Sequence, residues 1–160
     1  MDISIPINNM RFNFRVGAII IKDDMVLIIN NSKSDYYYTV GGRVHIGEDT
    51  ISAVKREVFE ETALILDVKK LLYINENFFQ EGDTLPVHEI SFYYLMDGIF
   101  DFSDLKCNSL TENKEEETLR WVPIDALDEV DLFPDFLCTV LKNIGSYTSH
   151  VISRQKKGTN

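Results

Sequence analysis

The stretch Gly42–Leu64, GRVHIGEDTISAVKREVFEETAL, decides the fold class of this chain. Its second half carries Glu57, Glu60 and Glu61, so the carboxylates recur at intervals of three and four positions from Glu57. At about 100° per residue, such side chains share one face of a helix. Like charges at this spacing weaken an isolated helix, which indicates a cation on that face. Mg²⁺ and Mn²⁺ prefer oxygen ligands and fit it, and a merely solvated acidic face is the alternative.

The residues around the triplet favour the metal site over the solvated face. Arg56 lies beside the triplet and Glu48 lies before the helix. A bridge between their charged groups would hold the loop against the helix and keep the carboxylates in place. Gly41 and Gly42 add a stretch of backbone that an ion or a phosphate can approach closely, because no Cβ intervenes.

The whole stretch resembles the signature of the Nudix hydrolase family. That signature is Gly, five residues, Glu, seven residues, and then Arg-Glu-aliphatic-any-Glu-Glu-any-Gly-aliphatic. Gly42, Glu48 and the run 56–64 match eight of its nine defined positions. The exception is Ala63, which stands where the signature has the Gly that ends the helix. Alanine costs about 1 kcal/mol there if the backbone is left-handed, so the turn is expected to differ.

The resemblance implies a role for each polar residue of the stretch. Glu57, Glu60 and Glu61 would be ligands of Mg²⁺ or Mn²⁺, with the Gly42 carbonyl as a further ligand. Among them Glu60 is the favoured catalytic base, whereas Arg56 and Glu48 would support the catalytic site structurally. Some family members take the base from a later loop, and the run 115–117, three glutamates, lies in that region. An exposed acidic loop is the alternative for that run.

The family resemblance also implies the reaction. Nudix enzymes hydrolyse a nucleoside diphosphate linked to another moiety, with water attacking phosphorus and a divalent metal at the diphosphate. The expected substrate is therefore a small nucleotide derivative such as a nucleotide sugar, a dinucleotide or a nucleotide. Two alternatives stay open: a Nudix-fold sensor that binds a nucleotide without catalysis, and a hydrolase that acts on RNA 5′ ends.

The substrate itself is less well defined by the sequence. The ADP-ribose type of the family has a proline about fifteen residues past the signature Gly, and the diadenosine polyphosphate type has a tyrosine slightly further on. Residues 78–81 of this chain are Phe-Phe-Gln-Glu and carry neither mark. Aromatic rings stack on bases and Asn reads their edges, so segments 76–79 and 88–89 are candidates, with core packing as the alternative for the rings. The predicted substrate-binding residues are Arg43, Asn77, Phe79 and Glu116.

Outward from the signature, the pattern predicts one α/β domain over residues 1–160 with its core at about 12–143. Predicted strands, rich in β-branched and aromatic residues, are 12–21, 25–29, 36–40, 64–79, 87–96 and 119–122. Predicted helices are 49–62, with Ile51, Val54 and Val58 on its apolar stripe, 123–127 and 134–144. The Nudix resemblance implies an α/β/α sandwich with a mixed β-sheet. The C-terminal tail, which has no apolar pattern, is expected to fray.

The amino-acid composition limits the kinds of binding partner that are expected. Sixteen basic and 26 acidic residues give a net charge of −10, which disfavours binding to nucleic acid or to an anionic membrane. The apolar run 16–21 is far shorter than the roughly 20 residues that span a bilayer. The two cysteines lie far apart and suit a reducing compartment, so a cytoplasmic location is expected. The sequence leaves the oligomeric state open, a homodimer included.

Overall fold

A mixed β-sheet lies between two helical layers in the computed structural model, which describes residues 1–31, 35–81, 85–105 and 116–154. The strands are β1 (Ser4–Ile7), β2 (Met10–Ile19), β3 (Ile21–Lys22), β4 (Met25–Asn31), β5 (Tyr38–Arg43), β6 (Asp67–Glu81), β7 (Leu85–Asp97), β8 (Glu117–Pro123) and β9 (Ser149–Arg154). Their order is β3-β4-β5-β2-β7-β6-β9, with β1 paired to β2 and β8 paired to β4. The β2–β7 and β6–β9 pairs are parallel and the others antiparallel, so the predicted mixed sheet is confirmed.

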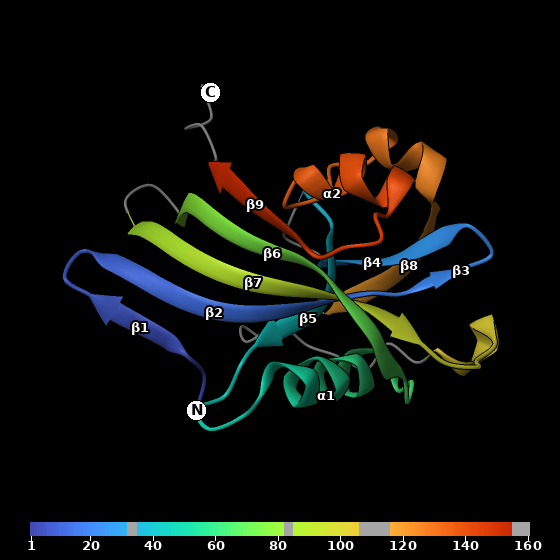
Figure 1. Ribbon diagram of the computed structural model, residues 1–160, viewed down its shortest axis with the longest axis horizontal. Helices are drawn as coiled ribbons and strands as arrows, with labels where there is room; N and C mark the ends of the chain where they lie inside the picture. Colours follow the sequence, from blue (N-terminus) through green and yellow to red (C-terminus); the bar gives the residue numbers. More distant parts are fainter. Residues whose placement is uncertain (32–34, 82–84, 106–115, 155–160) are drawn as a thin grey trace.

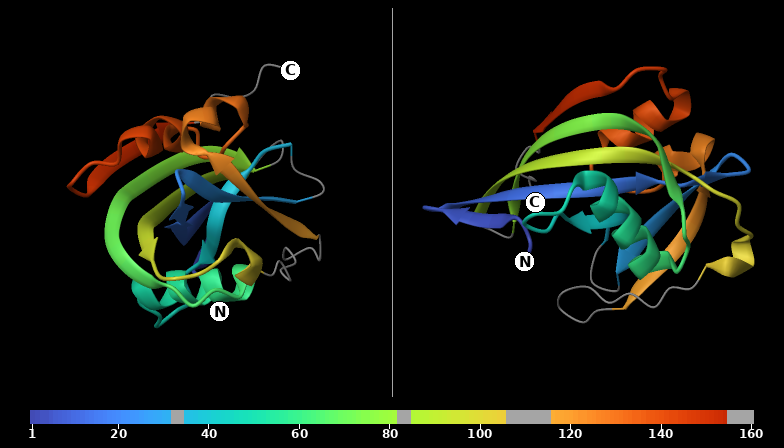
Figure 2. Two further views of the ribbon diagram at one scale, coloured as in Figure 1. Left: turned by 90° about the vertical axis from the view of Figure 1, so that its right-hand side faces the viewer. Right: turned by 60° about the horizontal axis from the view of Figure 1, so that its bottom comes forward.

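Helices cover both faces of this sheet. Helix α1 (Thr50–Thr62) lies under one face, and the 3₁₀ segments η2 (Ile124–Glu129) and η3 (Leu141–Asn143) flank helix α2 (Phe136–Val140) on the other, as Figures 1 and 2 show. The run Val26–Ile29 of β4 is fully buried because each face of the strand packs into a different apolar cluster. Burial on both faces explains why this strand is apolar without alternation. The expected α/β/α sandwich is confirmed.

Helix α1 begins and ends through local side-chain and backbone chemistry. The Asp49 carboxylate accepts hydrogen bonds from the backbone N–H groups of Ile51 and Ser52, at 3.0 and 2.9 Å, which makes it the N-cap. Val54 and Val58 are buried as predicted, but Ile51 is 49% exposed, so its place on the apolar stripe was wrong. Ala63 ends the helix with φ at 59°, in the left-handed conformation that the signature glycine usually adopts. The alanine therefore does not alter the turn.

Both ends of the described chain join the sheet, which corrects two expectations. Strand β9 runs parallel to β6 with Tyr73 opposite Ser149 and Phe78 opposite Arg154, so residues 149–154 do not fray. Strand β1 pairs with β2 at the other end, and the core thus extends beyond 12–143. Residues 155–160 lie outside the described part of the chain.

Two smaller differences concern the predicted helices. The segment predicted as helix 123–127 is the 3₁₀ segment η2, and the predicted helix 134–144 is shortened to α2 with η3 after it. The segment 101–117 contains a 3₁₀ turn, η1 (Phe102–Asp104), and residues 106–115 lie outside the described chain. Every expected strand is present with shifted ends.

Candidate active site

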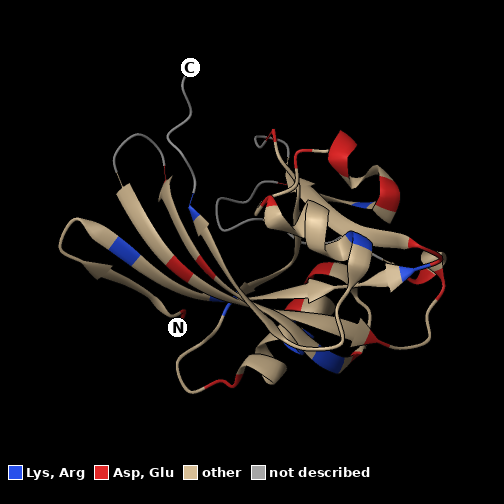
Figure 3. Ribbon diagram, turned by 45° about the horizontal axis from the view of Figure 1, so that its top comes forward, with Lys and Arg blue, Asp and Glu red and all other residues tan. Residues whose placement is uncertain are grey.

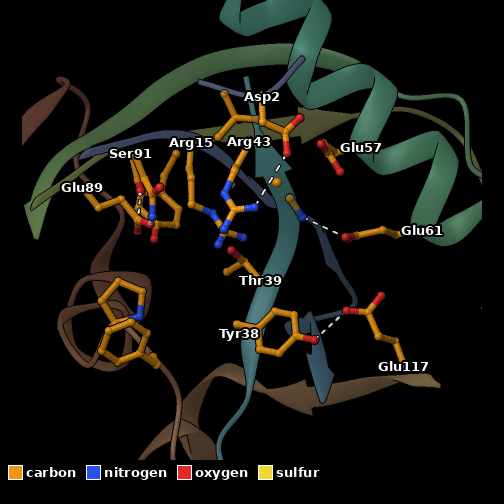
Figure 4. A pocket seen from close by; sticks show the side chains of 18 of the residues that line it. Asp2, Arg15, Tyr38, Thr39, Arg43, Glu57, Glu61, Glu89, Ser91 and Glu117 are labelled. Atoms are coloured by element: carbon orange, nitrogen blue, oxygen red, sulfur yellow. Dashed lines mark hydrogen bonds and ion pairs between the residues drawn. The ribbon is translucent and has the colours of Figure 1, made fainter. Parts of the chain in front are cut away.

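A cavity of about 650 Å³ is lined by residues of β2, β5 and β7, by the acidic triplet of α1 and by the segment 133–134. Figure 4 shows its lining side chains arriving from β2, β5, β7, β8 and α1. This volume is in the usual range for a small-molecule site. The lining has three parts, which we call the carboxylate pole, the guanidinium pole and the distal end.

The carboxylate pole consists of Glu57 and Glu61, which α1 directs toward the Gly41–Gly42 backbone. The Gly41 N–H donates to Glu61 Oε2 at 3.0 Å, and a Cβ at Gly42 would overlap the Glu57 carboxylate. Glu61 is only 9% exposed, and the Glu57 side chain is 12% exposed. Gly42 is therefore required so that Glu57 can lie against the strand, whereas a Cβ at Gly41 would overlap the Val16 carbonyl.

Burial raises the pKa of both carboxyl groups in the carboxylate pole. The pKa of Glu61 lies well above its ordinary value because burial outweighs the Gly41 hydrogen bond, and Glu57 and Glu117 raise it further. The pKa of Glu57 is raised by burial although Arg56 opposes the shift. Two buried carboxylates with too little positive charge nearby favour a cation beside them.

The predicted bridge between loop and helix is present. Arg56 Nε donates to Glu48 Oε1 at 2.8 Å, and Arg56 Nη2 donates to Glu48 Oε2 at 2.9 Å. The same guanidinium donates to the carbonyl of Arg43 at 3.1 Å and to Glu57 at 2.7 Å. Arg56 and the His45 N–H lower the pKa of Glu48 to about 2, against the effect of burial. This pair fastens the loop that follows β5 to α1.

Glu60, the third member of the triplet, lies at the rim of the cavity. Its side chain is 56% exposed, and Arg56 Nη1 donates to it at 3.2 Å. Across the described residues, no three His, Cys, Asp or Glu side chains converge as a complete metal site. The fit to a hard divalent cation therefore rests on Glu57 and Glu61, whose buried oxygens and raised pKa values suit such an ion.

The guanidinium pole consists of Arg15 and Arg43. They are directly opposite each other across the β2–β5 pair, and both line the cavity, as Figure 4 shows. Burial lowers the pKa of Arg15, but Glu89, Tyr93, Glu61 and Glu57 raise it more, so the group stays charged. Two like charges on opposing strand positions repel each other, and a bound anion would relieve that repulsion.

The distal end combines aromatic rings with a polar floor. Phe133 packs edge-on against Tyr36 and Phe79, with centroid distances of 5.8 Å in both pairs. The floor is formed by Asn13, Glu89 and Ser91, which are adjacent across β2 and β7 or along β7. Of the predicted substrate-binding residues, Phe79 lines this end.

Two predicted substrate-binding residues do not line the cavity. Asn77 is 1% exposed and is buried beside the floor, opposite Glu89 in the β6–β7 pair. Glu116 is exposed, and its neighbour Glu117 lines the cavity instead, because side chains alternate along a strand. Glu117 accepts a hydrogen bond from the Tyr38 hydroxyl at 2.6 Å. Burial raises the pKa of Tyr38, and this hydrogen bond raises it further.

Sequence reasoning overlooked Arg15 and Asn13. The signal was present in the segment Phe12–Val16, where polar and aromatic residues alternate. Period-two alternation puts Asn13 and Arg15 on one face of a strand. The sequence thus shows that Asn13 and Arg15 share a face of the strand. It does not show whether that face meets the cavity or the apolar core.

The basic residues in the described part of the chain are not gathered in one place. Figure 3 shows the Lys and Arg positions scattered over the ribbon, while acidic residues recur around η2. Such a pattern gives little electrostatic attraction for a long polyanion. Within the described ranges, no helix is both long and apolar enough to cross a membrane.

Comparison with known proteins agrees with this geometry. A family model described as NUDIX domain matches residues 11–137. A protein named ADP-ribose pyrophosphatase from Methanocaldococcus jannaschii is 33% identical over 126 residues, which cover 76% of this chain and 71% of that protein.

Solved structures share the fold. The E. coli ORF135 protein has a TM-score of 0.57 at 20% identity, over 86% of this chain and 91% of its own. A MutT protein from Methanosarcina mazei Go1 has a TM-score of 0.59 at 19% identity, over 83% of this chain and 92% of its own.

Proposed function

This chain belongs to the NUDIX domain family of pyrophosphohydrolases, and on that basis we propose that it cleaves a nucleoside diphosphate linked to a second moiety, with Mg²⁺ or Mn²⁺. The observation that carries this proposal is the pairing of opposite charges in one cavity. The carboxylate pole suits a cation. The guanidinium pole lies two residues further along β2 and β5 and suits phosphate oxygens. A metal-bound diphosphate needs both.

The residues proposed to hold the metal are Glu57, Glu61 and Glu60, with the Gly42 carbonyl. When bound, a divalent cation neutralises phosphate charge and lowers the pKa of a coordinated water. Arg56 and Glu48 position these groups through the bridge between loop and helix. Arg15 and Arg43 bind the phosphates and hold the diphosphate against the carboxylate pole.

The reaction needs a base for the attacking water. Water adds to one phosphorus, the bond to the bridging oxygen breaks, and the products are a nucleoside monophosphate and a phosphorylated partner. Glu60 and Glu117 both line the cavity and are the two candidates for taking the proton. Comparison of Glu60→Gln with Glu117→Gln distinguishes them, because loss of the base lowers kcat while KM stays near its original value.

ADP-ribose is the first substrate to test. The relative from Methanocaldococcus jannaschii carries that substrate in its name and shares 33% identity with this chain. The proline that accompanies ADP-ribose specificity in part of the family is missing from residues 78–80. The panel must therefore also include nucleotide sugars, dinucleotides and nucleoside triphosphates.

Phosphorus NMR of the products tests the proposal. Wild-type protein with Mg²⁺ should convert at least one panel member into a monophosphate and its partner. Glu57→Gln should remove this activity, and Glu129→Gln should not, because Glu129 is an exposed residue of η2 outside the cavity lining. Hydrolysis that persists undiminished in Glu57→Gln would refute the assignment of the site.

A further inference from the structure

A buried carboxylate at the distal end has no part in the proposed hydrolysis. Glu89 lies on β7 and is 7% exposed, and its side chain lines the cavity (Figure 4). No ion pair within 4.0 Å joins it to a Lys, Arg or His among the described residues. A charge buried without an ion pair is costly, so a carboxylate in this position needs hydrogen-bond donors.

A chain of hydrogen bonds from neutral donors fixes the orientation of Glu89. Ser4 Oγ donates to Asn13 Oδ1 at 2.8 Å, and Asn13 Nδ2 donates to Glu89 Oε2 at 3.4 Å. Ser91 Oγ donates to the other oxygen, Glu89 Oε1, at 3.2 Å. An ionised carboxylate has about four acceptor positions, so each oxygen retains about one for a ligand.

The position of Glu89 along the cavity follows from strand register. On β2, Gly17 is opposite Gly41, Arg15 is opposite Arg43, and Asn13 is opposite Glu89. Alternate residues of a strand are about 7 Å apart. The carboxylate pole, the guanidinium pole and Glu89 therefore follow one another in steps of this size. A group attached to a diphosphate held by the first two reaches the third.

The surroundings of Glu89 favour a neutral ring. Phe79 lies on the same face of the sheet, diagonally across the β6–β7 pair, and packs against Phe133. Aromatic side chains provide flat surfaces for a base or a sugar. A phosphate or a carboxylate in this place would be repelled by Glu89.

We propose that Glu89 determines which moiety the diphosphate carries, by accepting two hydrogen bonds from neighbouring donors on that moiety. Two parts of a nucleotide derivative supply such a pair: the N–H edge of guanine and the vicinal hydroxyls of ribose. Adenine offers a donor next to an acceptor and fits less well. This inference rests on the proposed function for the direction of the substrate, but its test needs no hydrolysis.

Calorimetric binding of monophosphates tests the proposal, because these compounds contain no anhydride to cleave. The base arm compares GMP, IMP and AMP, since IMP lacks the amino group of guanine. The sugar arm compares ribose 5-phosphate with 2-deoxyribose 5-phosphate, which lacks one hydroxyl of the pair. Each is titrated into wild type, Glu89→Gln and the exposed control Glu129→Gln.

In at least one arm, wild type and Glu129→Gln should prefer the ligand with both donors by tenfold to a hundredfold, roughly the effect of one hydrogen bond to a charged group. Glu89→Gln should reduce this preference to about twofold or less. Glu89→Asp keeps the charge but moves the carboxylate away from the ligand, so it should also lose the preference. This second variant is used if Glu89→Gln does not fold.

Three results would overturn the proposal. The first is that wild type shows no preference in both the base arm and the sugar arm. The second is that Glu89→Gln retains the preference that wild type shows. The third is that Glu89→Gln binds all five ligands, and inorganic phosphate, more weakly by the same factor. Glu89 would then be only a counter-charge for Arg15. None of these depends on turnover, so failure here is distinguishable from failure of the proposed hydrolase function.

Discussion

Gly42 has a specific steric role in the candidate site. Its backbone lies against the Glu57 carboxylate, and a Cβ at this position would overlap that group. The φ angle of Gly42 is not positive, so its backbone conformation does not require glycine. The close approach of the Glu57 side chain is the reason for the glycine. The carboxylate and the strand can therefore approach each other only if position 42 has no side chain.

Gly42→Ala should accordingly reduce kcat/KM by about tenfold to a hundredfold, the usual effect of displacing a metal ligand or its support. Gly145→Ala is the matched control, because a Cβ there has only an ordinary contact with the Tyr147 carbonyl at 3.9 Å. Steady-state kinetics on the best panel substrate provide the measurement. Equal kcat/KM values for the two variants would contradict the steric account.

At the scale of elements, helix α1 is the part that the sequence predicts best. Its N-cap Asp49, its buried Val54 and Val58 and its acidic face are all determined by neighbours within a few residues. The end of the helix at Ala63 was also in the right place, but its backbone conformation was not expected. Ala63 is itself exposed, but its neighbours Thr62 and Leu64 are buried, and this holds the alanine in a left-handed conformation that glycine adopts at lower cost.

Ala63→Gly should therefore stabilise the protein. Relief of the left-handed alanine exceeds the added backbone freedom of the unfolded chain, for a net gain of about 0.5–1 kcal/mol. Thermal unfolding should show a melting temperature higher by roughly 1–4 °C. A lower melting temperature would mean that the Ala63 methyl group contributes packing that outweighs the backbone strain.

The bridge between Glu48 and Arg56 predicts a pH-dependent contribution to stability. Hydrogen bonds from Arg56 lower the pKa of Glu48 from 4.5 to about 2 in the folded chain. A group with a lowered pKa stabilises the folded state fully above its unfolded pKa, and this contribution is lost as the pH falls toward the folded pKa. The relevant window therefore runs from about pH 5 down to about pH 2.

Glu48→Gln should lower the free energy of unfolding at pH 7 by about 1–3 kcal/mol, since it removes charged hydrogen bonds. Urea unfolding of wild type and variant at a series of pH values measures the difference. The difference should stay constant above about pH 5 and shrink below it. A difference that does not change between pH 7 and pH 3 would argue against this bridge as its source.

At the scale of the whole molecule, the C-terminal strand β9 meets the sheet far from its sequence neighbours, whereas β1 pairs with the adjoining strand β2. Strand β9 pairs with β6 more than 70 positions earlier in the chain, and Asn75 Nδ2 donates to the Val151 carbonyl and to Ser153 Oγ at 3.2 and 2.8 Å. Nothing local in Ser149–Arg154 identifies that partner. The same holds for the cavity, since register across three strands sets Arg15 and Glu89 beside the predicted carboxylates.

The packing of β9 on the sheet predicts that substitutions on its two faces differ in their effect on stability. Val151 packs against the cluster of Leu72, Tyr73 and Leu137, whereas Ile152 is 56% exposed. Val151→Asp should lower the free energy of unfolding by about 1–3 kcal/mol, because it places a charge against apolar side chains. Ile152→Asp is the control and should change it by about 0.5 kcal/mol or less. Equal effects in chemical denaturation would indicate that β9 does not pack as described.

Binding of Mn²⁺, followed by electron paramagnetic resonance, with hydrolysis assayed in the same samples, tests the central claim most directly. Wild type and Glu129→Gln should bind Mn²⁺ and turn over substrate alike. Glu61→Gln should weaken Mn²⁺ binding by about tenfold or more and lose turnover in parallel. It should remain folded, because the exchange removes a buried charge whose pKa is already raised. Wild-type metal binding and turnover in Glu61→Gln would contradict the account.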